Sequence, residues 1–331
     1  MKSTVVGFPK CAAKFCLCFG LLLSNGCGED SRQSDTPSPP SKAAAISQPK
    51  TLAEARKGFT TKLIRQERIG EPAPVPPPKL FRSVTYPSPI GEMAAYVGVS
   101  PGDGRKHPAI IWIVGGFANS VSEIAWEPNP PDNDQSASAY RKAGIVMMYP
   151  SMRGGNKNPG TLEGFYGEVD DVLAAASFLE KQDYVDPNRI YLGGHSTGGT
   201  LALLVAESSD RFRSVFAFGP TDDIRGYGQE NLPFPISNRK EAELRSPVKW
   251  LTAIHSPTFV FEGTSRANYD ALQSLSHANR NPLVHFYPLK GASHFSGLAR
   301  VNQLIAAKIL ADDGPIPTIG FKLDELAAAL K

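Results

Sequence analysis

A serine lies at the centre of the pentapeptide Gly194-His195-Ser196-Thr197-Gly198, which follows a short apolar run and precedes a helix-like one. This order is typical of a nucleophile elbow, where a tight strand-to-helix turn raises the serine hydroxyl above a sheet. The two glycines suit such a turn because they let the helix and the neighbouring strand approach closely. A chance match in a glycine-rich loop would lack the flanking strand and helix. The pattern therefore predicts Ser196 as a nucleophile.

A serine nucleophile needs a base, and one of the six histidines stands where that base belongs. His294 lies in a loop between the last expected strand and the last long helix. In a parallel sheet this loop is at the carboxyl edge, where an imidazole can reach Ser196 Oγ. We therefore expect His294 to be the general base. His195 is expected to point away from the site and to have a structural role.

Acyl transfer also needs two N–H donors for the oxyanion of its tetrahedral intermediate. The first is expected from Thr197, directly after the nucleophile. The second is expected from the loop that leaves the strand ending at Val114, either from Gly116 or from Phe117. A simple glycine turn is the alternative interpretation of this loop.

The elements that must hold these residues begin at Lys79, where apolar strands start to alternate with helical stretches. Such alternation predicts an α/β fold, with a mostly parallel sheet and helices on both faces. An antiparallel pair is expected first, at 81–86 and 93–99. The later strands are expected at 109–114, 144–149, 190–192, 215–218, 258–261 and 284–287, and the main helices at 169–181, 200–208, 269–279 and 298–310.

This pattern places one domain at residues 79–313, followed by a tail at 314–331 with a short helix at 324–330. Residues 223–250 show little periodicity and are expected to form a small cap insertion over the carboxyl edge of the sheet.

The N-terminus has the order of an export signal. Three lysines precede an apolar run too short to span a membrane as a stable helix, and Ser24-Asn25-Gly26-Cys27 follows. This resembles a bacterial lipoprotein signal over residues 1–26, with Cys27 as the lipidated residue. An ordinary secretory signal cut nearby is the alternative. Both predict an exported protein, and the first predicts one anchored to a membrane through its lipid.

Residues 27–78 are expected to form a disordered tether. The stretch 28–50 is rich in Ser, Pro, Asp and Lys without apolar periodicity, 51–68 could form one helix, and 71–78 is a proline-rich spacer.

Composition excludes several other kinds of chemistry. All four cysteines lie in the first 27 residues, so disulfides, cysteine metal sites and cysteine nucleophiles are excluded from the folded part. Removal of residues 1–26 takes away three lysines and no acids, which lowers the net charge from +3 to zero. Nothing in this balance predicts a nucleic-acid partner. No metal or organic cofactor is implied.

Several motifs between residues 80 and 312 recur together and in the same order in one known family. They are Gly115-Gly116-Phe117, Arg153-Gly154-Gly155, Gly167 to Asp171, Val185 to Ile190, the elbow, Arg245-Ser246-Pro247, and Gly291 to His294. In this respect the chain resembles the catalytic domain of the prolyl-oligopeptidase (S9) peptidases, within the α/β hydrolases. The resemblance implies an α/β-hydrolase fold and a serine nucleophile with a histidine base and an acid.

The chain departs from that family at two positions. The family often has a tyrosine before the glycines of the oxyanion loop, where this chain has Val114. The family's acid usually lies three residues after a glycine that ends the seventh strand, and counting from Gly263 gives Arg266. Glu262, at the very end of that strand, is the favoured substitute because its longer side chain could reach around the turn. Asp222, Asp223 and Asp270 remain open.

These observations predict a serine hydrolase, a peptidase or an esterase, that cleaves an ester or amide bond through a Ser196 acyl-enzyme. A small ester or a short peptide is the expected substrate. The alternative is a catalytically degenerate protein of this fold that binds a ligand or a partner, with Arg266 as its best support.

Overall fold

The computed structural model describes residues 51–331 apart from Arg266. Eight strands form one sheet in the order β1-β2-β4-β3-β5-β6-β7-β8. The strands are β1 (Phe81–Ser88), β2 (Gly91–Gly98), β3 (His107–Ile113), β4 (Val146–Pro150), β5 (Val185–His195), β6 (Val215–Phe218), β7 (Thr258–Gly263) and β8 (Val284–Leu289). The pairs β1–β2 and β2–β4 are antiparallel and all the others are parallel. The expected mostly parallel sheet is confirmed.

Helices precede, connect and follow these strands. They are α1 (Leu52–Arg56), α2 (Ser138–Lys142), α3 (Glu168–Leu179), α4 (Thr197–Ala206), α5 (Arg239–Glu243), α6 (Tyr269–Ala278), α7 (Leu298–Ala311) and α8 (Leu323–Ala329). The short helix α2 was not expected from the sequence. No helix in the described part of the chain is both long enough and apolar enough to span a bilayer.

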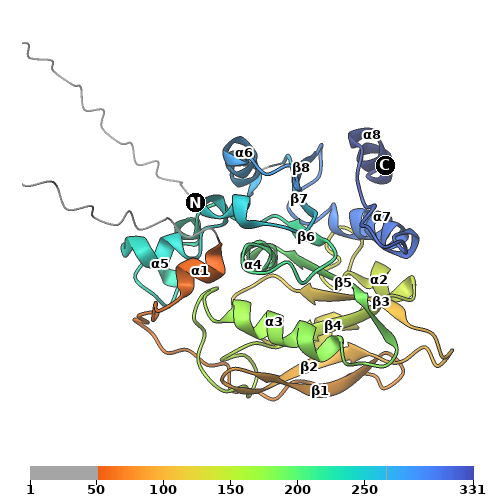
Figure 1. Cartoon of the computed structure of the whole chain (residues 1–331), viewed down its shortest axis with the longest axis horizontal. Helices are drawn as coiled ribbons and strands as arrows, with labels where there is room; N and C mark the ends of the chain where they lie inside the picture. Colours follow the sequence, from red (N-terminus) through yellow and green to blue (C-terminus); the bar gives the residue numbers. More distant parts are fainter. Residues whose placement is uncertain (1–50, 266) are drawn as a thin grey trace, which may run out of the picture. The chain divides into compact units, whose positions relative to one another are not determined.

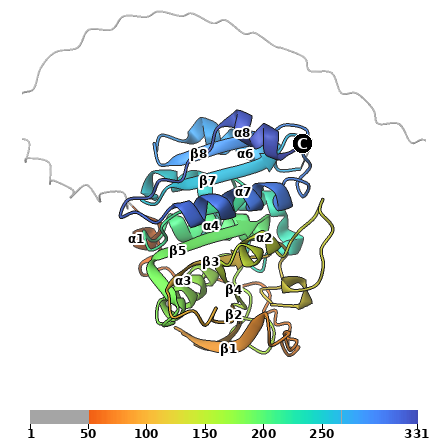
Figure 2. The same cartoon turned by 90° about the vertical axis from the view of Figure 1, so that its right-hand side faces the viewer.

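The two faces of the sheet carry different helices (Figure 1). Helices α3, α4 and α6 pack with one buried cluster, and α2, α7 and α8 with the other. Figure 2 shows the face with α2, α7 and α8 turned toward the viewer. Strand β3 supplies both clusters alternately: Ile111 and Ile113 face α3 and α4, whereas Ile110 and Trp112 face the opposite side. This alternation explains why the strand is an unbroken apolar run in the sequence.

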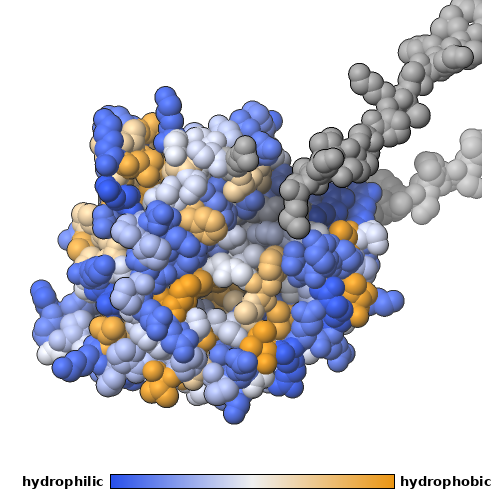
Figure 3. Space-filling model, turned by 180° about the vertical axis from the view of Figure 1, so that it is seen from behind, coloured by the Kyte–Doolittle hydropathy of each residue, from blue (hydrophilic) through white to orange (hydrophobic). Residues whose placement is uncertain are grey.

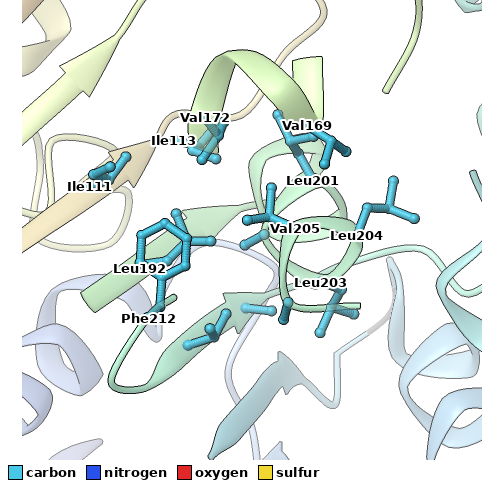
Figure 4. Packing of buried hydrophobic residues seen from close by; sticks show 14 of the residues in the cluster. Ile111, Ile113, Val169, Val172, Leu192, Leu201, Leu203, Leu204, Val205 and Phe212 are labelled. Atoms are coloured by element: carbon cyan, nitrogen blue, oxygen red, sulfur yellow. The ribbon is translucent and has the colours of Figure 1, made fainter. Parts of the chain in front are cut away.

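The cluster beneath α4 holds the strand that precedes the nucleophile. Leu201 and Val205 of α4 lie among Ile113, Val172 and Leu192, all of them buried (Figure 4). Because protein interiors are close-packed, the start of α4 has little freedom to move relative to the end of β5.

The structure corrects the expectation of a disordered tether for residues 51–78. This segment, which we call the strap, lies against the domain: Leu52 N–H donates to Glu207 O at 3.1 Å, and Ile69 N–H donates to Gly154 O at 2.8 Å. The expected helix at 51–68 is only five residues long, because Gly58 has φ +73°, a conformation that ends helices. No regular element follows until β1, as the proline-rich composition predicts.

The expected cap insertion lies between β6 and β7 and contains α5 and four short 3₁₀ turns. Arg245 is fully buried there and joins the insertion to the strap. Its guanidinium pairs with Glu241 Oε2 at 2.5 Å and donates to Thr61 Oγ1 at 2.6 Å. Two backbone N–H groups of the strap, those of Ile64 and Arg65, donate to Pro233 O. The insertion and the strap are therefore one hydrogen-bonded layer.

Seen from behind, the surface is mostly hydrophilic, with hydrophobic side chains gathered around a central hollow (Figure 3). The C-terminal tail packs on the outer face through α8, whose Leu326 is buried. Residues 1–50, including Cys27 and the signal-like segment, lie outside the described residues.

Candidate active site

The turn at Ser196 has the strained geometry expected of a nucleophile elbow. Its φ of 57° and ψ of −117° fall in a region that non-glycine residues rarely adopt. A Cβ added at Gly194 would overlap Gly198 O, and one added at Gly198 would overlap Ile113 O. The glycines therefore allow the close approach of helix and strand that the sequence predicts.

His294 and Glu262 lie in contact at the carboxyl edge. His294 Nδ1 is 3.0 Å from Glu262 Oε2, and the carboxylate side chain is only 1% exposed. Because a carboxylate oxygen accepts, the ring proton belongs on Nδ1, which leaves the Nε2 lone pair free. This is the tautomer that a general base for a serine requires.

Strand order explains why a glutamate can reach this histidine. Glu262 is on β7 and Ser196 follows β5, with β6 between them. Neighbouring strands are about 4.8 Å apart, so the acid and the nucleophile arise from backbones about 10 Å apart. The imidazole lies over the end of β6, because a Cβ at Gly219 would be 2.5 Å from Glu262 Oε2 and 2.7 Å from His294 Nδ1.

Gly219 is thus a site residue that the sequence analysis missed. Its φ is +56°, and Asn268 Nδ2 donates to its carbonyl at 2.7 Å. The residue before it, Phe218, accepts a hydrogen bond from Ser196 N at 2.7 Å. Backbone contacts therefore link Ser196 to the end of β6, where Gly219 lies beneath the His294 imidazole. Among the described residues no hydrogen bond joins Ser196 Oγ to His294, and such bonds often tighten only when substrate binds.

The other candidate acids have different surroundings. Asp223 pairs with Arg225 and caps the 3₁₀ turn that follows it. Asp270 is exposed in the first turn of α6. Asp222 is partly buried, and its backbone oxygen accepts from Val248 N. Of the four carboxylates considered, the structure brings only Glu262 to His294. Arg266 lies outside the described residues.

The oxyanion loop lies beside the elbow. A Cβ at Gly115 would be 3.2 Å from Ser196 Cβ. The N–H of Gly116 donates to Thr197 Oγ1 at 2.7 Å, and this hydroxyl donates to Gly116 O at 2.7 Å. The Gly116 N–H is therefore occupied and is not a free donor.

Two N–H groups remain. Thr197 is the first residue of α4, so its N–H has no acceptor within the helix. In the described part of the chain, the Phe117 N–H also has no hydrogen-bond acceptor. Of the two expected donors in the loop, the geometry favours Phe117 over Gly116.

His195 does not point away from the site, and this corrects the sequence expectation. Its ring centroid is 4.5 Å from that of His294, and its Nε2 is 3.0 Å from His294 O. Since a carbonyl only accepts, Nε2 must carry the proton. Burial, and next the neighbouring His294, lower the pKa of His195 to about 3, so its ring is neutral. His195 thus holds the backbone of the loop that carries His294.

A cavity of about 240 Å³ adjoins the oxyanion loop. Gly116, Phe117 and Thr197 line it, together with apolar side chains that include Met152, Leu162 and Phe165. Its position beside the free N–H groups suits it to hold part of a substrate.

Comparisons with known proteins agree with this architecture. Solved structures with the same arrangement include a puromycin-hydrolyzing peptidase of Mycobacterium tuberculosis, with a TM-score of 0.57 and 20% identity over 70% of this chain and 40% of that one. An esterase of Pyrobaculum calidifontis has a TM-score of 0.53 and 18% identity over 71% of this chain and 86% of that one. The fold is that of an α/β hydrolase.

Sequence comparisons relate this α/β hydrolase to peptidases. Residues 131–280 match the model of the prolyl oligopeptidase family. Prolyl oligopeptidase A of Amanita bisporigera is 25% identical over 214 residues, which are 54% of this chain and 26% of that protein. Dipeptidyl-peptidase 5 of Porphyromonas gingivalis is 28% identical over 134 residues, which are 38% and 19% of the two chains. The chain spans about a quarter or less of these relatives' length. Together the matches support an S9-like catalytic domain and a hydrolase.

Proposed function

We propose that this α/β hydrolase cleaves an ester or amide bond through an acyl-enzyme on Ser196. The observation that carries the proposal is the 3.0 Å contact between Glu262 Oε2 and His294 Nδ1 beside the strained turn of the nucleophile. A non-catalytic binding protein would have no need for a buried carboxylate that fixes the tautomer of this histidine. Glu262 thus takes the place of the acid that Arg266 replaces in the sequence.

In the proposed reaction, Ser196 Oγ forms a bond to the carbonyl carbon and gives its proton to His294 Nε2. Glu262 stabilises the imidazolium that results. The N–H groups of Thr197 and Phe117 bind the oxyanion. The bond to the leaving group then breaks, and His294 returns the proton to the leaving oxygen or nitrogen. Water repeats these steps to release the acid and restore Ser196.

The proposed substrate is a small ester or a short peptide, because the cavity beside the oxyanion loop has room for one side chain or acyl group. A dry apolar cavity of about 150 Å³ holds a benzene ring, so 240 Å³ accommodates a ring with a short substituent. The lipoprotein-like signal leads us to propose that the enzyme acts outside the cytoplasm, anchored to a membrane through Cys27.

A fluorophosphonate probe, which reacts only with an activated serine, tests the nucleophile. We expect the wild type to be labelled and Ser196→Ala to be unlabelled with a nearly unchanged melting temperature. Labelling that persists in Ser196→Ala would remove the assignment.

Steady-state kinetics on a neutral 4-nitrophenyl ester test the acid. Removal of a triad acid lowers kcat by about 10⁴-fold in the best-studied case, so Glu262→Gln should lower kcat by about a thousandfold or more. Asp270→Asn is the control, because its exposed carboxylate belongs to α6, and it should change kcat less than about threefold. Equal rates for the two variants would leave Glu262 without the role proposed here.

A further inference from the structure

The cavity beside the oxyanion loop contains one buried acid, Glu168, at the start of α3. Its residue is only 2% exposed. Oε1 accepts hydrogen bonds from Asn119 Nδ2 at 3.0 Å and from Glu163 N at 2.7 Å. Oε2 has no hydrogen-bond partner among the described residues. The carboxyl group is therefore held firmly by one oxygen and left unsatisfied at the other.

An unsatisfied buried oxygen is unfavourable, because burial removes its hydrogen bonds to water and nothing replaces them. The nearby cation does not supply the missing partner. The Arg153 guanidinium is committed to both oxygens of Asp171, at 2.9 and 3.0 Å, and to Glu163 Oε1 at 2.7 Å. Arg153 thus pairs with two acids, Asp171 and Glu163, and not with Glu168. The cluster of these four residues contains three acids and one base.

The charge of the cavity wall has one sign. Its charged lining residues are Glu67 and Glu168, and no lysine, arginine or histidine lines it within the described part of the chain. Glu67 belongs to the strap and is half-exposed, and it pairs with Arg65. Glu168 is buried, and the two arginines whose charges act on it, Arg153 and Arg245, are hydrogen-bonded to other acids. An apolar cavity with one unpaired acid in its wall favours a ligand that is apolar along its length and positive at its end.

We propose that this cavity is a specificity site for a positively charged group of the substrate, an ammonium or amidinium attracted by the charge of the Glu168 carboxylate in its wall. The proposal rests on the proposed function, since it gives the substrate class of the same site. The apolar part of the group lies along Phe117, Met152 and Phe165, which line the cavity between the oxyanion loop and α3. The reacting carbonyl then lies at the N–H groups of Thr197 and Phe117.

The ionisation of Glu168 sets the pH range of this preference. Burial raises the pKa of Glu168, and the charge of Arg153 opposes the rise. The charge of Arg245 also acts on this carboxyl group. Glu163 is the other acid that faces it and raises the pKa further, and Asn119 Nδ2 is a neutral donor. A protonated Glu168 has no charge to attract a cation, so the preference should weaken as the pH falls through this raised pKa.

Binding measured without catalysis tests the site directly. Benzylamine and benzyl alcohol have the same ring and similar size, and only the first is charged at pH 7.5. Calorimetric titration of the wild-type protein should give benzylamine a Kd at least tenfold lower than that of benzyl alcohol. Glu168→Gln keeps the shape and an acceptor for Asn119 and Glu163, and it should reduce the difference to less than twofold. Glu67→Gln removes the other acid of the wall and should keep the preference.

Three results would overturn the proposal: no preference for benzylamine in the wild type, a preference that survives Glu168→Gln, or an equal loss in Glu67→Gln. The last would mean that the charge at the strap attracts the cation. Melting temperatures of both variants within a few degrees of the wild type would show that loss of binding is not loss of fold.

Kinetics separate this proposal from the proposed function. The 4-nitrophenyl ester of N-acetyl-lysine places the charge on the acyl side, and that of N-acetyl-norleucine is its uncharged control. The acetate ester of 4-(aminomethyl)phenol places the charge on the leaving group, and that of 4-ethylphenol is its uncharged control. In one of these pairs the charged ester should have a kcat/KM at least tenfold higher, and Glu168→Gln should abolish the preference. Preferential benzylamine binding without hydrolysis of any ester would refute the serine hydrolase and leave the cation site standing. Hydrolysis of all four esters without charge preference would do the reverse.

Discussion

Replacing Gly219 by alanine should disable the site by a clash that can be separated from backbone strain. The new Cβ would lie 2.5 Å from Glu262 Oε2 and 2.7 Å from His294 Nδ1, closer than real Cβ atoms approach. Either the imidazole or the carboxylate must move, and a displacement of about 1 Å at a catalytic group costs about a hundredfold in rate. Complete separation of the acid from the base would approach 10⁴-fold. We therefore expect kcat on a neutral ester to fall between these limits.

The same substitution also strains the backbone, because an L-residue in the left-handed region costs about 1–2 kcal/mol. Gly144→Ala is the matched control. Gly144 has φ +82° and follows α2, and an added Cβ there would have nothing within 4 Å. At about 2–4 °C per kcal/mol, both variants should lose several degrees of melting temperature. Only Gly219→Ala should lose activity. A kcat within about threefold of that of Gly144→Ala would refute this account of the contact between His294 and Glu262.

Three further changes have defined outcomes. Glu207 is fully buried, and both of its carboxylate oxygens lack a hydrogen-bond partner among the described residues. Burial raises its pKa well above 4.5. The contribution of this carboxyl group to the stability of the fold is therefore present below about pH 4.5 and is lost as the pH rises through the raised pKa. Glu207→Gln should therefore melt about 2 °C or more higher at pH 8, with the gain vanishing near pH 4, and a gain at pH 4 as large as that at pH 8 would contradict this origin. His195→Phe keeps the ring against His294 but loses the hydrogen bond to its carbonyl, and kcat should fall roughly ten- to a hundredfold with little change in KM, whereas an unchanged kcat would show that the loop needs no such anchor. Cys27→Ala should abolish metabolic labelling with radioactive palmitate in a bacterial host, and a wild type that takes up no label would point to an ordinary secretory signal.

Local patterns in the sequence predict those features that depend on neighbouring residues. The pentapeptide around Ser196 predicts a strained turn, and the structure has it, because the turn is set by two glycines within five positions. Strand β6 is predicted at its observed bounds, since four apolar residues stand between Ser214 and Gly219. Strand β5 is longer than expected: Val185 to Arg189 contains a proline and polar residues, yet Val185 pairs with His107.

Features that depend on distant residues could not be found in this way. Gly219 looks like any glycine after a strand until His294, 75 positions later, is placed above it. The Gly116 N–H looks like a free donor until the Thr197 hydroxyl is seen to accept its hydrogen bond. The strap has no apolar periodicity, because a few scattered apolar side chains such as Leu52 and several polar contacts hold it, among them the ion pair of Arg56 with Asp170 at 2.8 Å. The proximity of Glu262 to His294 was favoured from its sequence position, and its catalytic role stays a prediction.

The place of Glu262 on β7 itself has a consequence for how this protein can vary. A carboxylate within a hydrogen-bonded strand is fixed by the sheet, with Glu262 in register with Pro288 of β8. The turn after Gly263 then has no acid to hold in place. Such surface turns tolerate insertions and deletions when no functional side chain depends on their length. Homologues that share a glutamate at the end of this strand can therefore differ in the length of the following turn and keep the same contact. A survey of homologues that looks for the acid three residues later would count such proteins as inactive.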